Sequence, residues 1–299
     1  MNAPAIPPVG RCARIPCGST EALVSLDVGP RVIAYGPVGG PNLFAVFEDG
    51  APLGDGGCKL YGGHRLWYGP EDAARTYHAD NESVDHREEG GEHVFSCRPD
   101  PFGIRKTIRI RADAAQEALH IRHVLTNASS EPASLFPWAL TVMAPGGECA
   151  FPLPPFRSHV EDALPAGPLV LWSYTRMGDP RWSWGSHVVR LRQASIDAPQ
   201  KVGALVRQGI AAYANHGLTF LKRFEYVAGT SYPDFGCNFE TFTRRDMLEV
   251  ESLGPMYTLQ PKESCELRET WYVLRESAPP TSDEACGEWF EDLASKYPL

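Results

Sequence analysis

Clusters of basic residues are missing from this sequence. Its 299 residues include 28 Lys and Arg against 37 Asp and Glu, a formal net charge of -9, and no run of lysines or arginines occurs. Because binding to nucleic-acid phosphates needs a basic surface, the composition argues against a nucleic-acid partner. The same acidic balance offers no attraction to an anionic membrane, so we expect no membrane partner either.

We also find no sequence pattern typical of an export signal or a membrane-spanning segment. Residues 1–10, MNAPAIPPVG, lack the basic and then apolar pattern of a signal peptide, and no apolar run is long enough to span a bilayer. The eight cysteines are scattered, and none forms a CxxC pair. We therefore expect reduced thiols in a cytoplasmic protein, with no structural zinc, other metal or cofactor.

Long stretches without a helix breaker are scarce, because 28 glycines and 27 prolines punctuate the chain. Between them lie short β-rich runs such as RVIAYG, KTIRIRA and ALHIRHVLTN, several of which alternate apolar and polar residues. This spacing predicts an all-β sandwich or barrel rather than βαβ units. Since no repeat or low-complexity linker is present, we interpret residues 1–299 as one domain.

One helix is expected near the C-terminus, in TSDEACGEWFEDLASKY at residues 281–297. Thr281 and Glu284 have the spacing of a capping box, which predicts Thr281 as the N-cap. Ala285, Trp289 and Leu293 then share one helical face, which we expect to pack on the edge or face of a sheet.

A predicted hairpin concentrates carboxylates in NFETFTRRDMLEVESLGP, residues 238–255. In its second strand, Glu249 and Glu251 point away from the apolar neighbours Leu248 and Val250. A turn of two or four residues would place Glu240 opposite Glu251, whereas a three-residue turn would send Glu240 to the other face. Like charges across a ladder are destabilising, so such a pair indicates either a site or a solvated sheet face.

A second segment, CKLYGGHRLWYGPED at residues 58–72, combines two glycines with an imidazole, a guanidinium and aromatic rings. The glycines let the backbone approach a neighbour or a ligand closely. His64, Arg65 and Trp67 suit a sugar, because charged groups bond its hydroxyls and flat rings cover its C–H faces. The alternative is a loop whose aromatic residues cap the core.

Two further segments contain aromatic or histidine residues but give less indication of a site. WSYTRMGDPRWSWG, residues 172–185, presents Trp182 and Trp184 after a turn, and each is expected to be covered by core, partner or ligand. In HIRH, residues 120–123, the two histidines lie on opposite faces of a strand, so they cannot chelate one ion together.

Taken together, these segments resemble the galactose mutarotase-like (aldose 1-epimerase) superfamily. The resemblance covers most of the chain and is carried by VSLDVGPRVIAYG, GPNLFAV, YGGHRLWYGPED, FPWALTVMAPGG, YPDFGCNFETFT, and MLEVESLGP with LQPKESCELRETWYV. It implies a large antiparallel supersandwich whose curved face binds a monosaccharide. The implied partner is a small carbohydrate, and we expect a monomer or homodimer.

The resemblance also implies acid–base chemistry at the anomeric carbon, with a glutamate as base and a histidine as acid. Glu249 in LEVES matches the family glutamate. Tyr61 stands where the family has the histidine of His-Gly-Gly, and His64 is the nearest imidazole that could replace it. Glu249 is therefore the expected base, with His64 or Tyr61 as acid.

Seven further residues are expected to orient the sugar. These are Arg65, Trp67, Trp138, Trp182, Asn238, Glu240 and Glu251. Two alternatives stay open: a sugar-binding or sensing protein without catalysis, and a glycosidase or lyase that uses the cluster of Glu240, Glu249 and Glu251.

Overall fold

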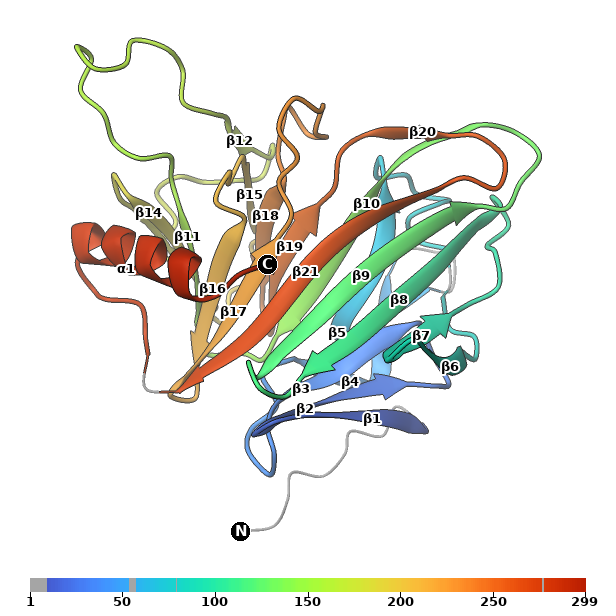
Figure 1. Ribbon diagram of the computed structural model, residues 1–299. Helices are drawn as coiled ribbons and strands as arrows, with labels where there is room; N and C mark the ends of the chain where they lie inside the picture. Colours follow the sequence, from blue (N-terminus) through green and yellow to red (C-terminus); the bar gives the residue numbers. More distant parts are fainter. Residues whose placement is uncertain (1–9, 54–57, 79, 276) are drawn as a thin grey trace.

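The computed structural model describes residues 10–53, 58–78, 80–275 and 277–299. Two antiparallel sheets pack face to face, and one short helix lies beside them (Figure 1). This architecture confirms the prediction of an all-β sandwich with a C-terminal helix.

The first sheet has 11 strands. In spatial order they are β1 (Cys12–Cys17), β2 (Thr20–Ser25), β3 (Arg31–Pro37), β5 (Cys58–Gly69), β10 (Ala133–Met143), β19 (Met247–Leu253), β18 (Phe239–Arg244), β15 (Gln200–Ala204) and β12 (Leu169–Leu171). Off this path, β4 (Val46–Leu53) pairs with β5, and β20 (Tyr257–Leu259) pairs with β10.

The second sheet has 10 strands. Their order is β13 (Trp182–Trp184), β14 (Val188–Arg192), β11 (Glu148–Pro152), β16 (Ile210–Asn215), β17 (Leu218–Phe224), β21 (Ser264–Arg275), β9 (Ala118–Asn127), β8 (Ile104–Asp113), β7 (Glu92–Ser96) and β6 (Asp85–Glu89). In Figure 1, the long strands β21, β9 and β8 cross in front of the first sheet.

The core fills the space between the sheets because successive side chains of each strand point to opposite faces. Leu248 and Val250 of β19 belong to this core, as do Phe220 of β17 and Trp271 of β21. In the first sheet, every second side chain therefore points away from the core, and the candidate site lies on this outer face.

The helix α1 (Asp283–Lys296) begins one residue later than the capping-box pattern predicted. Ser282, not Thr281, is the N-cap, since its hydroxyl accepts a bond from the backbone nitrogen of Ala285 at 3.2 Å. Phe290 and Leu293 are buried against residues of β16, β17 and β21. The prediction that this helix packs on a sheet is confirmed.

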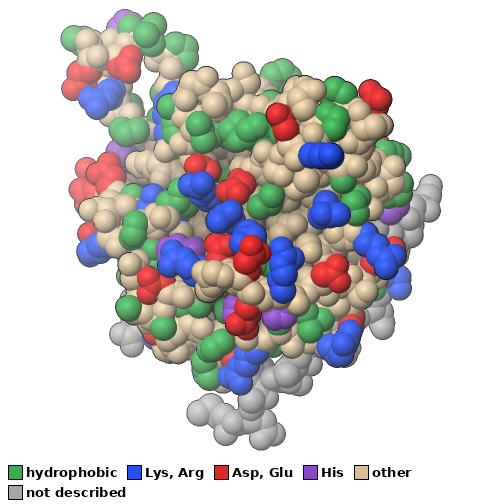
Figure 2. Space-filling view, turned by 45° about the vertical axis from the view of Figure 1, so that its right-hand side comes forward, with side chains coloured by type: hydrophobic (Ala, Val, Ile, Leu, Met, Phe, Trp, Pro, Cys, Tyr) green, Lys and Arg blue, Asp and Glu red, His purple; other side chains and the backbone are tan. Residues whose placement is uncertain are grey.

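No helix in the described ranges is long and apolar enough to cross a membrane. On the face shown in Figure 2, basic and acidic side chains of the described residues are interspersed and form no continuous patch of one sign.

Candidate functional site

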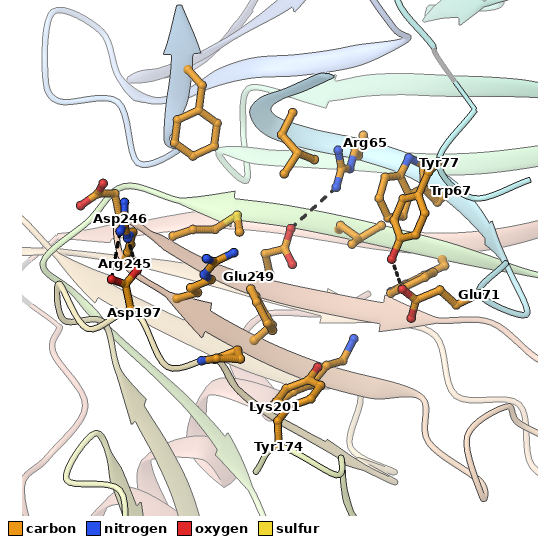
Figure 3. A pocket seen from close by; sticks show the side chains of 18 residues that line it. Arg65, Trp67, Glu71, Tyr77, Tyr174, Asp197, Lys201, Arg245, Asp246 and Glu249 are labelled. Atoms are coloured by element: carbon orange, nitrogen blue, oxygen red, sulfur yellow. Dashed lines mark hydrogen bonds and ion pairs between the residues drawn. The ribbon is translucent and has the colours of Figure 1, made fainter. Parts of the chain in front are cut away.

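A cavity of about 790 Å³ lies on the face of the first sheet that is opposite to the core (Figure 3). This volume falls within the range of small-molecule sites. Strand residues form its floor and loop residues its rim: Phe47, Leu60, Arg65, Trp67, Glu71, Tyr77, Trp138, Leu140, Tyr174, Asp197, Pro199, Lys201, Phe242, Arg244, Arg245, Asp246, Met247 and Glu249.

The hairpin of β18 and β19 carries Glu249 into this cavity. Its two-residue turn at Arg245 and Asp246 places Glu240 opposite Glu251, as the register for a two-residue turn predicts. Glu249 is 8% exposed. Burial and the charge of Glu251 raise the pKa of Glu249 to about 7, although Arg65 opposes the shift. A carboxyl with this pKa exchanges a proton readily near neutral pH.

Arg65 and Trp67 extend from β5 into the same cavity. The guanidinium carbon lies 3.8 Å from the centre of a Trp67 ring, a cation–π contact. Arg65 Nη2 is 3.8 Å from Glu249 Oε1, which is too long for a hydrogen bond. Arg65 Nε and Nη1 and Trp67 Nε1 are buried without a hydrogen-bond partner in the described structure. Burial, with the charge of Arg31, lowers the pKa of Arg65 to about 10.

Lys201, which the sequence pattern did not reveal, joins the two remaining carboxylates of the hairpin. Its Nζ lies 2.6 Å from Glu240 Oε2 and 3.1 Å from Glu251 Oε2. Glu251 Oε2 also accepts a bond from Trp138 Nε1 at 2.7 Å. Burial opposes charge on Lys201, yet Glu240 and Glu251 raise the pKa of Lys201 well above its usual range. Glu240 and Glu251 thus share one ammonium group, and burial raises the pKa of Glu240 well above its usual range despite the charge of Lys201.

Loop residues close the rim of the cavity with their own polar pairs. Tyr77 donates its hydroxyl hydrogen to Glu71, and Arg245 pairs with Asp197 (Figure 3). Tyr174 lies beside Lys201 in the same view, and burial raises the pKa of its phenol. Tyr174 therefore stays protonated and can donate a hydrogen bond near neutral pH.

The structure places His64 on the opposite side of the sheet from Glu249. Gly62 and Gly63 both have positive φ, 75° and 66°, and a side chain at either would collide with the backbone of β3 or the residue before β4. This double glycine interrupts the alternation of β5, so that His64 enters the core while Arg65 faces the cavity. The glycines thus serve close backbone packing rather than ligand contact.

His64 belongs to a hydrogen-bonded cluster between the sheets. Its Nε2 lies 2.6 Å from His123 Nε2, and its Nδ1 lies 2.9 Å from Thr141 Oγ1. His123 Nδ1 donates to the carbonyl of Leu267 at 3.1 Å. Burial, together with nearby cations, lowers the pKa of both histidines. Neutral His123 then accepts at Nε2, so His64 donates from Nε2 and accepts from Thr141 at Nδ1.

Lys222 and Glu269 complete this interior cluster. Lys222 Nζ lies 3.0 Å from Glu269 Oε1 and donates to Thr141 Oγ1 at 3.1 Å. Glu269 also accepts from Trp271 Nε1 at 2.7 Å and from the hydroxyl of Ser252. Ligand atoms of His64, His123 and Glu269 lie within 4.8 Å of one another. Since each already has a hydrogen-bond partner and Lys222 adds positive charge, we interpret the group as a hydrogen-bonded cluster rather than a metal site.

Five other expected site residues do not line the cavity, and two of them, Glu240 and Glu251, are bound by Lys201 as described above. Asn238 bonds the backbone of Val206 through both amide atoms, at 2.7 and 3.0 Å. Trp182 is buried, with its Nε1 bonded to Gln200 at 3.0 Å. Tyr61 is half-buried, with the guanidinium of Arg31 5.8 Å from its ring. These residues have structural contacts in place of cavity contacts.

Comparison with solved structures identifies the fold. A galactose mutarotase-like protein from Lactobacillus casei matches with a TM-score of 0.58 and 12% identity over 88% of this chain and 100% of the other. A candidate aldose 1-epimerase from Escherichia coli matches with a TM-score of 0.57 and 11% identity over 89% and 99%. The chain has the galactose mutarotase-like fold. A galactose mutarotase related enzyme from Lactobacillus acidophilus has this mutarotase-like fold too, at 6% identity and a TM-score of 0.55 over 89% and 98%.

In sequence comparisons, no family model and no curated protein matches the chain. The resemblance inferred from the sequence is thus confirmed for the mutarotase-like fold, and the activity has to be argued from the cavity.

Proposed function

We propose that the protein binds a monosaccharide in the cavity and catalyses acid–base isomerisation at or near its anomeric carbon. The main observation is a buried carboxyl, Glu249, with a pKa near 7, set beside the unpartnered N–H groups of Arg65 and Trp67. Sugar hydroxyls both donate and accept hydrogen bonds, so they match this set of groups. The aromatic rings of Trp67, Trp138 and Tyr174 suit the C–H faces of a sugar.

In the proposed reaction, Glu249 removes the proton from the anomeric hydroxyl while the bond between the anomeric carbon and the ring oxygen breaks. The ring oxygen takes up a proton, the new carbonyl group rotates, and the reverse steps close the ring. Tyr174 is the simplest proton donor, because the hydroxyl of Tyr77 is already bonded to Glu71. His64 is unsuited to this role from its position in the core.

NMR exchange spectroscopy between anomers tests this proposal on a panel of aldoses and uronic acids. Glu249→Gln is expected to slow enzyme-dependent exchange by at least about 100-fold, the usual contribution of a general base. Asp246→Asn is the matched control, since it removes a carboxylate of the rim and leaves the buried Glu249 in place. Unchanged exchange in Glu249→Gln would refute the assignment of the base.

A sugar-binding protein without catalysis is the second candidate. It is favoured by one observation: none of the described residues that line the cavity is a histidine. It predicts that sugars bind without faster anomer exchange. The glycosidase or lyase alternative has less support, because Lys201 engages both Glu240 and Glu251.

A further inference from the structure

Arg65 is a buried cation whose hydrogen-bonding capacity is largely unused. It is 2% exposed, and its Nε and Nη1 have no partner in the described structure. Its one ion-pair partner among the described residues, Glu249, is 3.8 Å away. Buried donors without an acceptor are costly, and because Arg65 lines the cavity, an acidic ligand there can offset this cost.

Two other cations of the cavity, Lys201 and Arg245, have carboxylate partners at close distance, unlike Arg65. Lys201 is matched by two carboxylates, and Arg245 is matched by Asp197. Arg244 lines the cavity and forms no ion pair with a described residue. Arg65 on the floor and Arg244 on the rim are therefore the lining cations without a carboxylate at hydrogen-bond distance among the described residues.

The short distance between Arg65 and Glu249 restricts where a ligand can carry its negative charge. If Glu249 acts on the anomeric hydroxyl, the group bound by Arg65 must be close to that hydroxyl. In the pyranose form of a uronic acid, the ring oxygen joins the anomeric carbon to the carbon that bears the carboxylate. The phosphorus of a 6-phosphate is two bonds further from the ring than the carboxylate carbon of a uronic acid, so it fits the short separation of Arg65 and Glu249 less well.

We propose that the preferred substrate is a uronic acid whose carboxylate binds the guanidinium of Arg65 while its anomeric hydroxyl faces Glu249. The planar guanidinium matches a carboxylate in shape and charge. This inference rests on the proposed function and narrows it from monosaccharides in general to one acidic class.

Anomer exchange of galacturonate and glucuronate, compared with galactose and glucose, tests the inference. The wild-type protein is expected to favour the uronates by at least about tenfold in kcat/KM, as a charge-assisted hydrogen bond allows. Arg65→Gln is expected to reduce this preference to less than about threefold. Arg245→Gln removes a cation that already has a partner, and it is expected to retain the preference.

For each variant, kcat/KM for a uronate is divided by kcat/KM for the corresponding neutral sugar. A general loss of activity cancels in this ratio. Circular dichroism and thermal melting confirm that each variant is folded. Where anomer exchange is too slow to measure, ligand-observed NMR gives the Kd of each sugar, and the preference is calculated from the Kd values instead. Equal exchange of neutral sugars and uronates, or a preference for hexose 6-phosphates, overturns the inference and leaves the proposed isomerase intact. Absence of both binding and exchange for every sugar overturns the proposed function as well.

Discussion

Two groups of buried ionisable side chains lie on opposite faces of β5, β10 and β19, and they differ in how their polar atoms are satisfied. In the interior cluster, Lys222, Glu269 and both histidines use their side-chain nitrogens and oxygens in hydrogen bonds. On the cavity side, Arg65 has two nitrogens without a partner. Satisfied buried groups hold a structure together, whereas an unsatisfied donor beside a cavity can bond a ligand there.

The largest expected effect comes from breaking the interior ion pair. Lys222→Met leaves Glu269 as a buried charge without a cation, which is expected to lower the free energy of unfolding by about 3–5 kcal/mol. Denaturant unfolding measures the loss. The double variant Lys222→Met with Glu269→Gln removes both charges and is expected to recover part of it. A single variant as stable as the wild type would show that the interior cluster does not stabilise the fold.

A second prediction uses the raised pKa of Glu249. The unfolded chain ionises this carboxyl near pH 4.5 and the folded protein only near pH 7, so ionisation costs folding free energy as the pH rises between these values. Glu249→Gln should therefore gain up to about 2–3 kcal/mol of stability relative to wild type from pH 4.5 to 8.

Denaturant unfolding of both proteins across this pH range provides the test. The lowered pKa values of His64 and His123 have the opposite effect: their stabilisation is complete above the ordinary histidine pKa and is lost as the pH falls. Since both proteins share these histidines, that contribution cancels in the difference. A difference that does not change with pH would show that Glu249 is not desolvated as the structure implies.

The sequence allowed much of the cavity face to be predicted. Short β-rich runs indicated the sandwich, and the period of two in MLEVESL separated Glu249 from its core neighbours. The family-like LEVES motif then singled out Glu249. The hairpin register followed from a two-residue turn, although no Asn-Gly or Asp-Gly pair identified that turn.

The interior cluster could not be predicted, for two physical reasons. Gly62 and Gly63 interrupt the alternation of β5, so counting along the strand does not reveal that His64 enters the core. His123 and Lys222 come from strands of the other sheet, and no local spacing links them to His64. Lys201 was missed on the cavity side for the same reason, since its partners lie on β18 and β19.

A third prediction tests the hydrogen bonding of the interior cluster without changing its charge. Thr141→Val keeps the shape of the side chain but removes the hydroxyl that bridges Lys222 and His64. The unsatisfied Nδ1 of His64 is expected to cost about 1–2 kcal/mol of unfolding free energy. Thr141→Ser, which retains the hydroxyl, is the control. Equal losses in both variants would attribute the effect to packing rather than to the bridge.

The smallest expected effect on stability comes from Arg65, although it is as buried as the interior cations. Without ligand, Arg65→Met loses the contact with Trp67 and the long ion pair with Glu249 but no hydrogen bond. Because Glu249 can take up a proton when the cation is removed, the free energy of unfolding should change by no more than about 1 kcal/mol. With a uronate at about 100 times its Kd, the wild type should gain about 2.7 kcal/mol, whereas the variant at the same concentration should gain much less. Melting with and without galacturonate measures both. A large loss in Arg65→Met without ligand would place Arg65 with the interior cluster as a structural cation and remove the contrast between the two faces.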